Sequence, residues 1–422
     1  MALKFTKNEP GKVLNFKEYK KVSQPGDWLP QCATDGNGRP ISNLANVMIG
    51  LRADQNLLDL VALDEMLGIE VLQKPLPGEA VQPEGFKARA MTDEDVSAIQ
   101  EYLQQVGLRR VGKDTTFQAI SLRARERAYH PVQNLLTELK WDEVPRTGNW
   151  LSTYLGAEQT PYTERIGVMF LVSMVARAYE AGCKADYMVV LEGPQGARKS
   201  TACGILGYHW FSDSLPDVTA GKDVVQHLQG KWLIEIAEMS AMSRAETSAL
   251  KAFITRPVEQ FRPAYGRKEV VRPRQCIFIG TTNKDTYLLD ETGGRRFWPV
   301  KVGKINTDAL RADRDQLFAE ALQLYKAGTK WYPDDAFELQ YIKPEQDARF
   351  EADVWEESIR DFIDTYNPQS LRIGEVLEKV FDLEKGKHGR REQNRVTQVL
   401  TRIGWKQLQK DSAGYRPWGP PP

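Results

Sequence analysis

The chain has 422 residues, and its 57 Lys and Arg balance 57 Asp and Glu, so the formal net charge is zero. A uniformly basic coat, the simplest signature of nucleic-acid binding, is therefore excluded, although local basic segments are not. Hydrophobic residues make up 41% and charged residues 27% of the chain, which is typical of soluble globular domains. No stretch approaches the roughly 18 apolar residues of a membrane helix, and the N-terminus lacks a signal-peptide pattern. We therefore expect a cytoplasmic protein with no membrane partner.

The first region, residues 1–146, mixes polar turns with short helical patterns. Prolines and glycines between Lys74 and Phe86 predict an extended connection, because proline also displaces its predecessor from the helical region. A helix is expected to start at Thr92–Asp95, and a second is expected over Thr116–Arg127. We predict a small mixed domain, for which oligomerisation is one candidate role.

The second region, residues 147–351, has an alternating helix and strand pattern. A helix is predicted near Thr163–Tyr179. Buried strands are predicted at Tyr187–Leu191, Trp232–Ile236 and Cys276–Gly280. Strands separated by helices at this spacing indicate an α/β fold with a largely parallel sheet.

The third region, residues 352–422, predicts three helices followed by a hairpin. The first has apolar residues on one face between Trp355 and Tyr366, the second covers Gly374–Phe381, and the third ends at Gly404. This order favours a winged-helix-like domain.

The strongest local signal is Gly193–Thr201, which directly follows the first predicted strand. In a P-loop, glycines let backbone N–H groups wrap phosphates, a lysine reaches the β and γ phosphates, and a serine or threonine hydroxyl binds Mg²⁺. A helix starting near Lys199 would direct its N-terminal dipole at the anion. We therefore predict that ATP and Mg²⁺ bind here, through Gly193, Gln195, Gly196, Ala197, Arg198, Lys199, Ser200 and Thr201.

One position departs from the pattern G-x-x-x-x-G-K-[ST], because Arg198 stands where the last glycine is expected. The substitution removes backbone freedom at the mouth of the loop and adds a bulky cation. The alternative interpretation is a glycine-rich turn at a helix start with a solvated Lys199.

Three further polar groups follow the loop in the order that an ATPase needs. Glu235 and Glu238 lie on or just beyond the second strand, where an acidic residue would hold Mg²⁺ or polarise water, and we favour Glu238 slightly for the metal. Asn283 follows the third strand and suits a γ-phosphate sensor. Arg295 and Arg296 follow a flexible turn and suit an arginine finger that acts on a neighbouring subunit. The alternatives are a solvated Glu235, an asparagine in an ordinary turn, and a surface salt bridge.

Taken together, these motifs resemble the virulence-associated E (VapE-type) proteins of phages and mobile elements, which are similar to superfamily 3 helicases with an AAA+ core. The resemblance rests on Tyr129–Pro131, Leu139–Asp142, Gly193–Thr201, Glu235–Glu238, Lys251–Phe253, Phe261–Arg267, Gly280–Asn283 and Gly293–Phe297. It implies a ring in the bacterial host cell, expected to be a hexamer, with ATP between subunits and single-stranded DNA in the centre. It also implies Lys199 and Ser200 as nucleotide and Mg²⁺ residues, Asn283 as sensor, and Arg295 or Arg296 as the finger.

Two basic segments are candidate DNA contacts. Arg262–Arg274 carries a net charge of +4, and the resemblance places a pore hairpin here, with Arg267 and Lys268 contacting phosphates. Lys385–Lys410 carries +7 and overlaps the predicted winged helix, where Arg391 and Arg395 are one turn apart and suit duplex DNA. Solvated charged surfaces, or a basic subunit interface for the second segment, are the alternatives.

The function predicted from these features is an ATP-dependent DNA helicase or translocase in phage or mobile-element replication. One alternative is a replication initiator that uses ATP to assemble on DNA and melts it without processive unwinding. Another is a nucleotide-gated regulatory or defence ATPase with a site weakened by Arg198.

Overall fold

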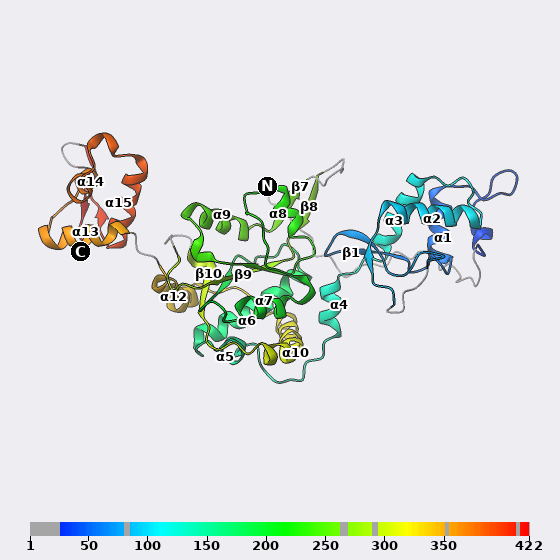
Figure 1. Ribbon diagram of the computed structural model, residues 1–422, viewed down its shortest axis with the longest axis horizontal. Coiled ribbons are helices and arrows are strands. Elements are labelled where there is room, and N and C mark those ends of the chain that lie inside the picture. Colours follow the sequence, from blue (N-terminus) through cyan, green and yellow to red (C-terminus); the bar gives the residue numbers. More distant parts are fainter. Residues whose placement is uncertain are drawn as a thin grey trace.

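The computed structural model describes residues 26–79, 85–261, 269–288, 294–350, 354–410 and 414–421. The chain forms three units in sequence order along its long axis (Figure 1). Among the described helices, none is both long and apolar enough to cross a membrane.

The N-terminal unit combines helices with a small antiparallel sheet, as a mixed domain was expected to do. Its elements are a 3₁₀ turn at Leu29–Gln31, α1 (Leu44–Ala53), β1 (Val61–Asp64), β2 (Ile69–Leu72), β3 (Arg89–Ala90), α2 (Asp93–Val106) and α3 (Lys113–Glu126). The predicted helix start is confirmed, because Thr92 and Asp95 cap α2 by exchanging side-chain to backbone hydrogen bonds. Trp28, Leu51 and Ile99 are buried in the core of this unit.

The central unit contains a five-stranded sheet in the order β10-β4-β9-β6-β5, and every pairing is parallel. The strands are β4 (Met188–Glu192), β5 (Phe211–Ser212), β6 (Leu233–Ile236), β9 (Ile277–Thr282) and β10 (Phe297–Lys301). The three predicted strands are confirmed as β4, β6 and β9, and the parallel α/β sheet is confirmed with them.

Helices cover both faces of this sheet (Figure 1). They are α4 (Pro131–Glu138), α5 (Trp150–Leu155), α6 (Pro161–Tyr179), α7 (Lys199–Gly207), α8 (Lys222–His227), α9 (Arg244–Ile254), α10 (Thr307–Lys326), α11 (Asp335–Phe337), a π-helix at Glu338–Ile342, and α12 (Lys343–Ala348). Val189 and Leu191 face the cluster formed by α5, α6, α7 and α10, while Met188 and Val190 face α8 and α9.

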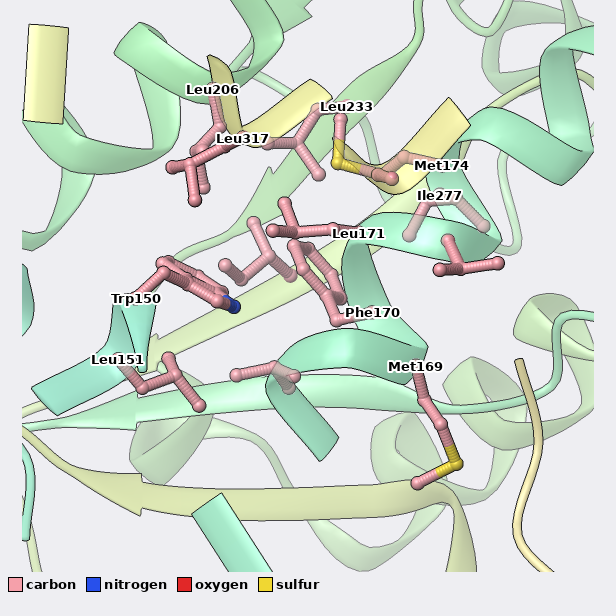
Figure 2. Close-up of a cluster of buried hydrophobic side chains, with 14 of the residues drawn as sticks. Trp150, Leu151, Met169, Phe170, Leu171, Met174, Leu206, Leu233, Ile277 and Leu317 are labelled. Carbon is pink, nitrogen blue, oxygen red and sulfur yellow. The ribbon is translucent and has the colours of Figure 1, made fainter. Parts of the chain in front are cut away.

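Figure 2 shows the first of these two clusters, in which Trp150, Phe170 and Leu317 come from three different helices. The helix predicted near 163–179 is confirmed as α6, which lies in this cluster and is buried along most of its length. Val132 and Leu136 of α4 belong to the same cluster. Helix α4 therefore packs with the central core.

An antiparallel hairpin projects from the central unit, formed by β7 (Val258–Phe261) and β8 (Val270–Pro273). The predicted tip, with Arg267 and Lys268, lies outside the described residues. At the base of the hairpin, Arg272 donates to the carbonyls of Leu67 and Gly68 in the β1–β2 turn, at 3.0 and 2.9 Å. Arg274 is buried and paired with Glu259. Two cations of the +4 segment are therefore engaged in contacts within the protein.

The C-terminal unit contains three helices and a short hairpin. Its elements are α13 (Val354–Tyr366), α14 (Ile373–Phe381), a 3₁₀ turn at Lys385–Lys387, α15 (Arg390–Arg402), β11 (Lys406–Gln407) and β12 (Trp418–Gly419). Leu371 adds an isolated antiparallel bridge to Trp418, so extended backbone lies between α13 and α14. Ile359, Leu377, Val396 and Trp418 share one small core. The predicted helices and hairpin are confirmed.

Candidate nucleotide-binding site

The glycine-rich loop 193–198 joins the end of β4 to the start of α7. Strand β4 lies between β9 and β10, and the chain crosses from β4 to β5 at one edge of the sheet but from β9 to β10 at the other edge. Ligands of open parallel sheets bind at such a switch point, beyond the carboxyl ends of the strands. Gly193 is required there, because a Cβ would lie 2.9 Å from Cγ2 of Val302. Gly196 has a φ of +81°, which favours glycine.

Arg198 has the left-handed backbone conformation that explains why a glycine was expected at this position. Its φ is +66° and its ψ is 27°, and it directly precedes the first residue of α7. This conformation costs a non-glycine residue about 1–2 kcal/mol. The side chain is exposed, and Nη1 lies 3.4 Å from Oγ1 of Thr307 at the start of α10.

Lys199 is buried inside the loop and is held by acceptors from two parts of the chain. Its ammonium donates to the carbonyls of Gly193 and Pro194, at 2.6 and 3.0 Å, and to Oδ1 of Asn283, at 2.9 Å. Burial lowers the pKa of Lys199. A partly desolvated cation gains free energy from a nearby anion, so this position suits a phosphate group.

Glu235 of β6 is the acidic residue that the structure places against the loop. The hydroxyls of Ser200 and Thr281 each donate to its Oε1, at 2.7 Å. Its other oxygen, Oε2, is buried and has no hydrogen-bond partner among the described residues. Because Ser200 donates its proton to Glu235, the lone pairs of its hydroxyl remain available to a cation. An unpaired carboxylate oxygen beside a serine hydroxyl fits the oxygen ligands that Mg²⁺ prefers.

Glu238, which the sequence analysis favoured slightly for the metal, occupies a different place. It lies two residues beyond β6, has a φ of +52°, and its side chain is exposed. The structure therefore brings Lys199, Ser200, Glu235 and Asn283 together. Glu238 is exposed and is not part of this group. Gln195 and Thr201 are also exposed, while Ala197 is half-buried.

Arg295 and Arg296 lie at the opposite end of the sheet from the loop of their own chain. They precede β10, whose Phe297 pairs with Met188, five residues before Gly193. At about 3.3 Å per residue this places the two arginines roughly 16 Å or more from the loop, which is longer than an arginine side chain. Neither can contact a nucleotide bound at its own loop.

The two C-terminal arginines differ in their surroundings. Arg391 is exposed near the start of α15, whereas the guanidinium of Arg395 lies 4.2 Å from the ring centroid of Trp355. Arg395 therefore contributes to packing between α15 and α13.

Two features of the candidate site were not predicted from the sequence. Thr281 is two residues from Asn283, and alternation along β9 could have placed both on one face. The second is an ion pair between the buried Glu192, which directly precedes Gly193, and the partly exposed Arg349, with Nε 3.1 Å from both carboxylate oxygens. No local signal joins these residues, because they are far apart in the sequence.

No curated protein matches the chain. Among solved structures, the A form of the NrS-1 C-terminal region without ligand has 15% identity and a TM-score of 0.41, covering 82% of this chain and 84% of that one. A second structure of that region has 15% identity and a TM-score of 0.42, covering 85% of this chain and 95% of that one. The sequence profile of the virulence-associated protein E-like domain matches residues 136–351, half of the chain. The chain therefore belongs to the virulence-associated protein E-like family.

Proposed function

We propose that the protein is an ATP-dependent DNA helicase or translocase that acts in phage or mobile-element replication. The observation that carries this proposal is the convergence of Lys199, Ser200, Glu235 and Asn283, which come from three separate segments, at one edge of the parallel sheet. The alternative of a glycine-rich turn with a solvated lysine does not account for this arrangement, because Lys199 is buried and donates to Asn283. Membership of the virulence-associated protein E-like family supports the same conclusion.

In this proposal, the position of each side chain determines its role. Lys199 exchanges its contacts with the loop carbonyls and Asn283 for phosphate oxygens, and Asn283 then orients water near the γ-phosphate. Ser200 and Glu235 hold Mg²⁺, directly or through water, and the bound ion would neutralise charge on the β and γ phosphates. Glu238, exposed at the rim, is the remaining carboxylate that can polarise the attacking water.

The proposed active form is a ring, with a hexamer as the expected size. The distance of Arg295 and Arg296 from their own loop supports a role in trans, because only a neighbouring subunit can bring them to a nucleotide. An arginine supplied in this way stabilises the charge of the transition state. DNA would contact the tip between β7 and β8, through Arg267 and Lys268.

The test is ATP hydrolysis and strand displacement on forked DNA by the full chain. Lys199→Ala is expected to abolish hydrolysis, and Lys268→Ala to retain basal hydrolysis while losing stimulation by DNA. Arg311→Ala, at an exposed position of α10, is the matched control. Absence of ATP hydrolysis by the wild-type protein with Mg²⁺ and DNA would refute the proposed helicase or translocase activity.

A replication initiator is the second candidate, favoured by the C-terminal unit. Its order of helix, extended bridge, helix, helix and two strands suits a winged helix with α15 as the DNA-reading helix. Arg391 is exposed on that helix. An initiator would bind a particular duplex sequence and displace no strand in the same assay.

A further inference from the structure

Arg198 retains a strained backbone at a position where glycine would carry no strain. Its φ of +66° lies in the region that bulky side chains avoid. Strain of this kind persists where the surrounding structure enforces it, and it clusters at active sites and ligand-binding loops. The conformation of Arg198 therefore makes its side chain, at the mouth of the loop, a candidate functional group.

The guanidinium lies at the outer edge of the loop, whereas Lys199 occupies its interior. Lys199 is 7% exposed and has three oxygen acceptors, while Arg198 is exposed and contacts Oγ1 of Thr307 at 3.4 Å. That distance is long for a hydrogen bond and involves a neutral hydroxyl, so an anion would be a stronger partner. Thr307 is the first residue of α10, so the guanidinium lies between the N-terminal ends of α7 and α10. Both helix ends favour negative charge.

We propose that the guanidinium of Arg198 contacts the polyphosphate chain of the nucleotide from its solvent side, while Lys199 contacts it from within the loop. The proposal rests on the proposed ATP site and specifies its ligand chemistry: the outer contact recognises phosphate charge and is independent of the base. An arginine is suited to this task because it stays charged and presents several donors in a fixed plane. A phosphate contact by this side chain would also compensate for the backbone strain that arises where a glycine is expected.

The decisive variant is Arg198→Gly, which restores the expected glycine and removes the side chain. If the Arg198 side chain makes no contact with the nucleotide, this variant should bind nucleotide as well as or better than the wild type. If the arginine binds phosphate, affinity should fall about 10- to 100-fold, the range for losing a hydrogen bond from a charged group. Its melting temperature should be no lower than that of the wild type, because glycine adopts this φ without strain.

The experiment measures dissociation constants of the full chain for a fluorescent ATP analogue, with inorganic tripolyphosphate as competitor. Arg198→Lys should recover part of the affinity, and Arg311→Ala, on the exposed face of α10, should match the wild type. The loss in Arg198→Gly should be similar for ATP and tripolyphosphate. Wild-type affinity in Arg198→Gly, or a loss confined to ATP, would overturn the proposal and leave the nucleotide site intact. Absence of nucleotide binding by the wild type would refute the proposed function as well.

Discussion

The ion pair between Glu192 and Arg349 connects the base of the glycine-rich loop to the end of the central unit. Glu192 is the last residue of β4 and is 1% exposed, and Arg349 directly follows α12. Three contacts of 3.1 Å join the guanidinium to the carboxylate. The backbone carbonyl of Arg349 accepts from the amides of Tyr287 and Leu288, in the segment that follows Asn283. Arg349→Ala removes the guanidinium and leaves these backbone contacts in place.

The expected cost follows from the burial of the carboxylate that remains. Removing one partner of a buried ion pair costs about 3–5 kcal/mol, because the other charge is left uncompensated. For a unit of about 220 residues, this corresponds to a fall in melting temperature of roughly 6–20 °C. Lys343→Ala, which breaks an exposed pair with Asp347, is the control and should cost no more than about 0.5 kcal/mol.

The effect should also depend on pH, with a sign that the structure determines. Burial raises the pKa of Glu192 above its ordinary value of 4.5, although the Arg349 guanidinium opposes the shift. A raised folded pKa means that the folded state binds more protons, so stability falls as the pH rises from about 4.5 through the folded pKa. Without Arg349 the folded pKa of Glu192 rises further, so the variant should lose more stability at pH 8 than at pH 5. Thermal unfolding at both pH values measures this, and a loss below about 1 kcal/mol, or an equal loss at both, would refute the reasoning.

Three other outcomes are expected. Glu235→Gln should reduce ATP hydrolysis by about 10- to 100-fold while nucleotide affinity stays within a few-fold, and unchanged hydrolysis would show that Glu235 does not hold the proposed metal ion. Burial lowers the pKa of His130, the cap of α4, below 6.5, so the unfolded state binds the proton first and stability should be lost as pH falls below 6.5. His130→Asn retains a capping acceptor and should weaken this dependence between pH 7.5 and 5, as followed by melting temperature. Arg391→Ala should weaken duplex binding and reduce the slope of affinity against salt by about 1. Arg395→Ala, in contrast, should mainly lower the stability of the C-terminal unit, and an equal loss of binding in both variants would show that the stacked arginine also reaches DNA.

Elements defined by local patterns were accessible from the sequence. Strands β4, β6 and β9 follow from short apolar runs, and the start of α2 from Thr92 and Asp95. The loop at Gly193 could be located because its glycines, lysine and serine are adjacent in the chain. Strand β10 was missed because Pro299 argues against a strand. Proline is tolerated there because β10 is an edge strand, which only the order of the sheet reveals.

The sequence by itself determined the parallel α/β core, the position of the glycine-rich loop, and the candidate acidic, amide and arginine residues, because each depends on neighbours in the chain. Only the tertiary structure decided which of these candidate residues lie next to the glycine-rich loop. Alternation along β6 and its register with β9 place Glu235 beside Ser200 and Thr281, and leave Glu238 at the rim. Parallel pairing of β10 with β4 separates Arg296 from its own loop. These relations depend on strand register and burial, which arise only when distant segments pack together.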